Sequence, residues 1–267
     1  MARTLTARLG DAAERAVEAA RATVLPIHPL QIDVLKLIAC VCMLIDHINT
    51  CLYDRASVWA WLIGRLAFPL FGLTFVLTLK AHKAMATAKR LFIWAICTQP
   101  VYALAFANTG FSPWWAGNIL FSFAAVAYLV GLSQTPSWAN VAKGLAVFVV
   151  ASIIQAPSSF GVAGLTYLLS LYYAVRATPR VATVLAALAG AAVAFLNPGW
   201  VVVAGGWVAV LATLISMSIA ARKLTPVRLG IASWLPLIYV AHLIFLCGIL
   251  ALGMSLEPTW PSARNAM

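Results

Sequence analysis

The chain has 267 residues, of which 63% are hydrophobic and only 9% are charged. Soluble domains carry about a quarter charged residues, because a chain of this size leaves much of its surface in water, so the composition excludes an ordinary soluble fold. The formal net charge of +11 would suggest a nucleic acid partner in a soluble protein. In a membrane protein the same excess of Lys and Arg is typical of cytoplasmic loops, so we expect no nucleic acid partner.

Residues 1–28 differ from everything that follows. Leu5, Leu9 and Val17 recur at helical spacing, and Asp11 and Arg15 form an i,i+4 pair. This pattern predicts a short amphipathic helix, cytoplasmic or lying at the membrane interface, before the first proline-rich turn.

About nine apolar runs follow; most are close to the length of a membrane-spanning helix, whereas those within 161–197 are short, so the exact number of spans between 142 and 197 stays open. The sequence therefore predicts an all-α, polytopic transmembrane helix bundle over residues 29–252, followed by a short outer tail at 253–267. The runs lie at about 31–52, 57–79, 90–107, 115–132, 142–156, 161–175, 181–197, 200–219 and 229–252.

The distribution of basic residues predicts the orientation of these spans. With the N-terminus in the cytoplasm, fourteen of the 18 Lys and Arg residues fall on the inner side, and only Arg55 and Arg264 fall on the outer side. Cytoplasmic loops carry the excess of Lys and Arg in multi-pass proteins. We therefore expect a multi-pass protein in contact with membrane lipid, with a cytoplasmic N-terminus and an outer C-terminus.

Four charged residues remain inside the predicted spans, all in the first two: Asp33, Lys36, Asp46 and Arg65. A charge near the bilayer centre costs about 3 kcal/mol, so such residues usually face a cavity and have partners. Lys36 and His47 are eleven residues apart and share a helix face. Arg65 enters the membrane at about the depth of Asp46 and His47. This arrangement can hold an anionic substrate and move a proton.

Structural interpretations of the same residues remain open. Lys36 can extend its ammonium group to the inner headgroups, and Asp33 can be an interfacial charge at the start of its helix. Asp46 and Arg65 can form an ion pair that only holds two spans together. Although His47 shares a face with two cysteines, no fourth ligand accompanies them, so we expect no metal site.

Several sequence blocks occur in a fixed order: Ile32-Asp-Val-Leu-Lys36, Leu44-Ile-Asp46-His47-Ile, Gly64-Arg65-Leu-Ala-Phe-Pro69, Thr98-Gln99-Pro-Val-Tyr102, Asn118-Ile-Leu-Phe-Ser and Ile238-Tyr239-Val-Ala-His242-Leu. Together they resemble the TraX family of bacterial conjugation proteins, over about residues 30–250. The family is associated with N-terminal acetylation of F-type pilin. The opening His28-Pro-Leu-Gln31 looks more like the TrbP-type conjugal transfer members. Lys36 and His47, separated by ten residues, are similar to a pattern of the wider membrane acyltransferases.

The resemblance implies a multi-pass acetyltransferase of the bacterial inner membrane. It would take acetyl from cytoplasmic acetyl-CoA to an acceptor at the outer side, the pilin N-terminus or another group, with other conjugation proteins as further partners. His47 would be the general base or a transient acyl carrier, and Asp46 or Asp33 would orient it. Lys36 would assist at the inner mouth and Arg65 would stabilise the oxyanion.

Further residues follow from the same interpretation. The basic loop of Lys80, Lys83, Lys89 and Arg90 would bind the phosphates of coenzyme A, although ordinary positive-inside loop charges explain it equally well. Substrate-binding candidates for the cavity wall, besides Asp33, are Gln99, Asn118, Tyr239 and His242. The chain departs from the family at Ser158-Ser159, where an acidic residue is usual.

Two other classes of function remain alternatives. One is a non-enzymatic chaperone or scaffold of pilus assembly, for which the polar residues would serve only packing. The other is a proton-coupled transporter, which also uses intramembrane Asp, Lys and His. The absence of an inverted repeat in the sequence makes the transporter the weaker alternative.

Overall fold

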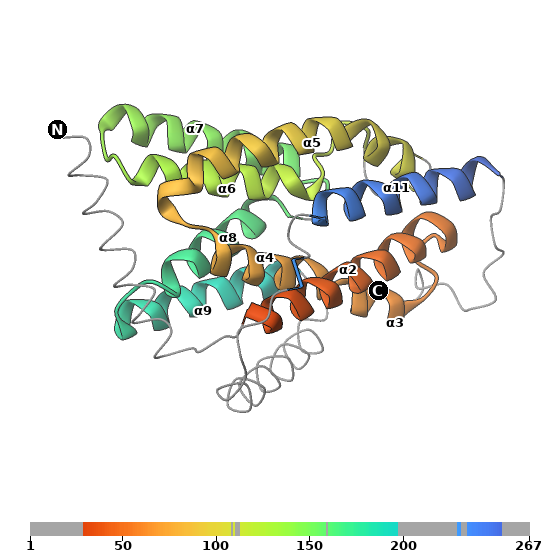
Figure 1. Cartoon of the computed structure of the whole chain (residues 1–267), viewed down its shortest axis with the longest axis horizontal. Helices are drawn as coiled ribbons and strands as arrows, with labels where there is room; N and C mark the ends of the chain where they lie inside the picture. The colour runs from red at the N-terminus through yellow and green to blue at the C-terminus, as the bar shows by residue number, and fades with distance from the viewer. Residues whose placement is uncertain are drawn as a thin grey trace.

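Every regular element in the described residues of the computed structural model is a helix (Figure 1). The structure describes residues 29–107, 109, 113–158, 160–196, 229–230 and 234–252. The elements are α2 (Pro29–Tyr53), α3 (Val58–Gly64), α4 (Ala67–Thr78), the 3₁₀ turn η1 (Ala81–Lys83), α5 (Ala84–Phe106), α6 (Ile119–Ser133), α7 (Trp138–Gln155), α8 (Gly161–Ala174), α9 (Pro179–Leu196) and α11 (Leu235–Ala251).

The all-α prediction is thus confirmed for these residues. Each predicted run except 200–219 corresponds to one helix or, for 57–79, to the pair α3 and α4. The run at 200–219, the N-terminal helix at 1–28 and the tail at 253–267 lie outside the described residues.

Two helical stretches among the described residues are long and apolar enough to cross a membrane. They are Val58–Thr78, which comprises α3 and α4, and α7. Four further apolar helices are shorter, between 10 and 17 residues: Ile119–Ser133, Gly161–Ala174, Pro179–Val193 and Leu235–Ala251. The nine crossings and their orientation remain a prediction.

Helix α7 shows most directly where apolar surface faces outward. Most of its side chains are hydrophobic, yet only 11% of its most apolar window is buried. An apolar stripe at four-residue spacing, more than 45% exposed at each position, runs along it: Val141, Leu145, Val149 and Ile153. Exposure of this apolar stripe to water would be unfavourable, whereas contact with lipid tails would not.

The helices α2, α4, α5 and α11 form the part of the bundle that matters for the site (Figure 1). Helix α2 packs against α3, α4 and α11, and α5 packs against α6 and α11. Ala95 and Ala105 of α5 and Leu243 of α11 are almost fully buried in a cluster that also contains Cys42 and Met43 of α2. Because the two α5 residues are small, α5 and α11 come close together and polar residues can converge near α2.

A break separates α3 from α4 at Arg65 and Leu66, within the predicted second span. Pro69 accounts for it, because proline has no N–H for the carbonyl of Arg65 and its ring crowds that carbonyl. The backbone turns there with a tighter bond from the Leu66 N–H to the Ile63 carbonyl, at 3.1 Å. The break places Arg65 at a helix end, beside α2.

Candidate functional site

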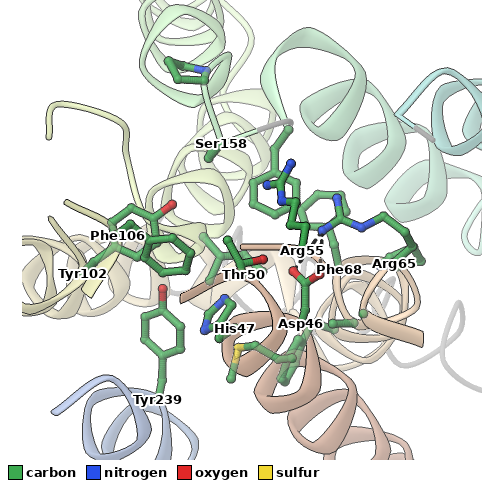
Figure 2. A pocket seen from close by; sticks show the side chains of 18 residues that line it. Asp46, His47, Thr50, Arg55, Arg65, Phe68, Tyr102, Phe106, Ser158 and Tyr239 are labelled. Carbon is green, nitrogen blue, oxygen red and sulfur yellow. Dashed lines mark hydrogen bonds and ion pairs between the residues drawn. The ribbon is translucent and has the colours of Figure 1, made fainter. Parts of the chain in front are cut away.

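Two adjoining pockets lie along α2. The first, here called the His47 pocket, has a volume of about 90 Å³ and is lined by His47, Asp46 and Arg65 among others (Figure 2). The second, here called the Lys36 cavity, has a volume of about 440 Å³ and is lined by Lys36 and Asp33 at the N-terminal half of α2. The two share a wall of four residues that line both: Met43, Phe71, Ile119 and Tyr239.

His47 forms a hydrogen bond with His242 of α11, with 2.8 Å between His47 Nδ1 and His242 Nε2. The two rings are stacked with centroids 5.0 Å apart, and the edge of Phe106 packs against His47 at 5.0 Å. His242 Nδ1 lies 3.3 Å from the carbonyl of Ile238, which can only accept. In neutral rings, His242 then donates from Nδ1 and accepts at Nε2. His47 therefore donates from Nδ1, and its Nε2 carries the lone pair.

Asp46 and Arg65 form an ion pair that links α2 to the end of α3. The Arg65 Nη2 donates to both carboxylate oxygens of Asp46, at 3.0 and 2.9 Å, and the two side chains are 16% and 15% exposed. Arg65 also lies over the ring of Trp61, 5.5 Å from its centroid. The ion pair between two spans that the sequence left open is thus present, and the Asp46 carboxylate is paired with Arg65.

Gly64 allows this close approach of α3 to α2. A Cβ at this position would lie 2.6 Å from Asp46 Cγ, which is closer than real Cβ atoms come to any neighbour. Only glycine therefore leaves the Asp46 carboxylate in place beside Arg65.

Lys36 and Asp33 form a second ion pair, in the wall of the Lys36 cavity. Lys36 Nζ lies 3.4 Å from Asp33 Oδ1, and each side chain is 7% exposed. The other carboxylate oxygen of Asp33 accepts the backbone N–H of Leu229 at 3.0 Å. Lys36 is therefore buried beside a carboxylate instead of reaching outward, and Asp33 ties α2 to the chain before α11. With Asp33 and Asp46 both paired to cations, the hydrogen-bond partner of His47 is His242, contrary to the expectation of an orienting Asp.

The four basic loop residues separate in the structure. Arg90 lines the Lys36 cavity. Lys89 lines a different, apolar groove between α5, α6 and α7. Lys80 and Lys83 are exposed near η1 and line neither pocket along α2.

Gln99 and Asn118, expected in the cavity wall, join helices instead. Asn118 caps α6 by accepting the N–H of Leu120, and its amide donates to the Ala95 carbonyl at 2.8 Å and to Gln99 Oε1 at 3.0 Å. Gln155 of α7 donates to the Asn118 carbonyl at 2.9 Å. Neither Gln99 nor Asn118 lines the His47 pocket or the Lys36 cavity, whereas Tyr239 lines both.

Four polar residues of the His47 pocket were not among the site residues predicted from the sequence: Thr50, Arg55, Tyr102 and Ser158 (Figure 2). Arg55 counted as an outer loop charge, yet it reaches the pocket beside Asp46. Burial and the neighbouring charge of Arg65 lower the pKa of the Arg55 guanidinium. No periodicity reveals this position, because Arg55 belongs to a turn and not to a helix face.

Comparisons with known proteins agree on one family. The sequence model described as TraX protein matches residues 31–250. Two curated relatives, each called Protein TraX, come from Escherichia coli and from Escherichia coli strain K12. Each is 34% identical over 229 residues, which cover 84% of this chain and 88% of the relative. No solved structure matches.

Proposed function

The chain belongs to the TraX family, and from this membership and the site geometry we propose that it is an integral membrane acetyltransferase. It transfers acetyl from cytoplasmic acetyl-CoA to an acceptor at the outer side, the N-terminus of a pilin in plasmid conjugation. Its membrane character is supported by the two candidate membrane helices. The observation that carries the enzymatic proposal is the His47 pocket, which shares a wall with a larger, positively charged cavity.

The Lys36 cavity is the proposed donor site. Its volume of about 440 Å³ is typical of small-molecule sites, and Asp33, Lys36 and Arg90 give its lining one net positive charge. That charge suits the phosphates of coenzyme A, with Arg90 at the mouth. Met43 and Tyr239 belong to the wall shared with the His47 pocket, so a thioester held at this wall would lie next to that pocket.

His47 Nε2 is the proposed general base. It takes a proton from the acceptor amine as the nitrogen attacks the thioester carbonyl; a C–N bond forms, the C–S bond breaks, and the proton passes to the leaving thiolate. Arg65 stabilises the negative charge on the carbonyl oxygen. Its Nε is buried and has no hydrogen-bond partner among the described residues, so this N–H is available to donate.

Two neighbouring basic residues test the donor site. Replacing Arg90 by Gln should raise the KM for acetyl-CoA about tenfold, because a charge-assisted hydrogen bond to phosphate is worth about 1.5–3 kcal/mol. Lys89→Gln is the control: it removes the same charge from the neighbouring residue, which lines the apolar groove and not the Lys36 cavity, so the KM should not change. Initial rates of acetyl transfer in proteoliposomes measure both. Equal KM increases in the two variants would indicate a general effect of loop charge instead of a site.

His242 is expected to position His47. Because His242 Nε2 accepts the His47 Nδ1 proton, His242→Ala should lower kcat about 100-fold and leave the KM for acetyl-CoA unchanged. His242→Gln, whose side-chain oxygen can still accept, should recover part of that loss. A His47→Ala, His242→Ala double variant should be no slower than His47→Ala alone. Additive losses would show that the two residues act independently.

The function as a whole is tested on the acceptor. Mass spectrometry of the cognate pilin, from cells with and without this gene, should show an N-terminal acetyl group only when the gene is present. One acetyl group adds about 42 Da to the pilin. If the protein is an enzyme, this gain should appear in about equal yield whether or not pili assemble, which a scaffold would not produce. Unmodified pilin in both strains would contradict the proposal.

A further inference from the structure

The apolar groove that Lys89 lines is larger than either pocket along α2. Its volume is about 830 Å³, and α5, α6 and α7 contribute its lining. Helix α6 packs against both α5 and α7 (Figure 1), so its buried Ala124 and Ala125 form the floor between the other two helices. None of the described residues that line the groove lines the His47 pocket or the Lys36 cavity. The groove is therefore a separate feature of the molecule.

The length of the groove corresponds to one leaflet of a bilayer. Along α7 the lining runs from Ala146 to Ile154, which at 1.5 Å per residue is about 12 Å. The hydrocarbon core of a bilayer is about 30 Å thick, so one leaflet contributes about 15 Å. A partner helix that crosses the membrane would need a groove of about twice this length. The acyl chains of one leaflet fit the groove as it is.

Helices α5 and α7 begin at the same end of the groove. Met85, in the first turn of α5, packs directly on Gly131 near the end of α6. Gly144, in the N-terminal half of α7, lies beside Leu132 of α6. The first turns of both outer helices therefore lie beside the last turns of α6.

Two exposed lysines lie at this end. Lys89 is the charged residue among those that line the groove. Lys143 lies one turn before Ala146 and Val147, which line the groove, and so shares their face of α7. Because side chains in a helix point toward its N-terminus, Lys89 extends toward the start of α5 and Lys143 toward the start of α7. Both ammonium groups are thus directed to the same end of the groove.

The three helices of the groove carry no carboxylate that could neutralise these lysines. Between Asp54 and Glu257 the sequence contains no Asp or Glu. Within the described part of the chain, neither Lys89 nor Lys143 takes part in an ion pair. The charge at this end of the groove is therefore complementary to an anion from outside the protein.

We propose that the groove binds an anionic phospholipid, with its acyl chains between α5 and α7 and its phosphate at Lys89 and Lys143. An apolar groove of one leaflet's length that ends at two cations matches a molecule with tails at one end and a negative charge at the other. A zwitterionic phospholipid also has a phosphate, but its own ammonium group cancels that charge. The inference depends on the membrane character of the chain and not on its acetyltransferase activity.

The headgroup contact is tested with two lipids that have the same tails. The detergent-purified full chain is incubated with equal amounts of dioleoylphosphatidylglycerol and dioleoylphosphatidylcholine, and native mass spectrometry counts the bound lipids. The wild type should prefer phosphatidylglycerol about 25-fold, because each lysine near a lipid headgroup contributes about fivefold. Lys89→Gln and Lys143→Gln should each lower the preference to about fivefold. Arg180→Gln, which removes an equal charge at the exposed start of α9, should retain it.

The contact with the tails is tested by filling the groove from an exposed position. Val150 is 54% exposed and lines the groove, whereas the neighbouring Val149 is 47% exposed and does not. Val150→Trp should lower the retention of phosphatidylglycerol at least about tenfold, which is the effect of displacing two methylene groups from an apolar site. Val149→Trp should leave retention unchanged. Because both positions lie outside the core, both variants should fold.

Three results would overturn the inference. The first is equal retention of the two lipids by the wild type, or an undiminished preference in either lysine variant. The second is an equal effect of Val150→Trp and Val149→Trp, which would mean that lipid covers α7 without using the groove. The third is a dimer that Val150→Trp converts to a monomer, which would show that a second copy of the chain fills the groove.

Discussion

Replacing His47 by Ala is expected to lower acetyl transfer at least about 100-fold and to leave the protein folded in the membrane. A positioned general base increases the rate by a factor of about 10²–10⁴. Because His47 Nδ1 is engaged in the hydrogen bond with His242, the lone pair on His47 Nε2 is available to accept a proton. Transfer of radiolabelled acetyl from acetyl-CoA, in membranes containing equal amounts of each variant, measures the loss.

The matched control for this variant is His82→Ala. His82 belongs to the exposed turn η1 and lines neither the His47 pocket nor the Lys36 cavity. The His82→Ala variant should therefore transfer acetyl at the wild-type rate. Full transfer by folded His47→Ala protein would exclude His47 as the base.

Replacing Asp46 by Asn is expected to lower the free energy of unfolding by about 2 kcal/mol. Breaking a fully buried ion pair costs about 3–5 kcal/mol, and the 16% and 15% exposure of this pair reduces that cost. The loss is sizeable because Arg65 and Arg55 would then face one another without the carboxylate between them. Thermal unfolding of the detergent-solubilised protein, followed by tryptophan fluorescence, gives the measurement.

Asp54→Asn is the control for Asp46→Asn, since it removes the same charge. Asp54 is exposed, and asparagine tolerates its left-handed φ as well as aspartate does. Its unfolding temperature should stay within about 1 °C of the wild type, which corresponds to less than about 0.5 kcal/mol. An equal effect of both substitutions would mean that the Asp46–Arg65 pair does not stabilise the fold.

Helix positions followed from the sequence because they depend on local composition. Apolar runs long enough to cross a bilayer favour helices, and the boundaries of α2, α6 and α8 fall within four residues of the predicted ones. The face shared by Lys36 and His47 is likewise a property of one helix. Each of the two residues lines a pocket on that face. Because they are far apart along α2, Lys36 lines the Lys36 cavity and His47 lines the His47 pocket.

Partners between helices could not be obtained in this way. The sequence places Asp46 beside His47, but neighbours in a helix point in different directions, and the hydrogen bond of His47 runs to a residue 195 positions away. Gln99 and Asn118 are polar residues in apolar stretches of sequence, which indicates that their side chains have a role. The sequence does not show whether they line a cavity or join helices by hydrogen bonds. Only the packing of α5 on α6 decides that.

The sequence by itself determined the helical class, the family and the two polar levels on α2, because periodicity, composition and linear motifs are local properties. Only the tertiary structure decided that His242 completes the hydrogen bonding of His47, that Arg65 is paired with Asp46, and that Arg55 enters the same pocket. These contacts arise where α3 and α11 each pack against α2. The turn that brings in Arg55 depends on hydrogen bonds from Asn49 to residues up to eight positions later. Long-range packing sets such geometry, and no periodicity in the chain records it.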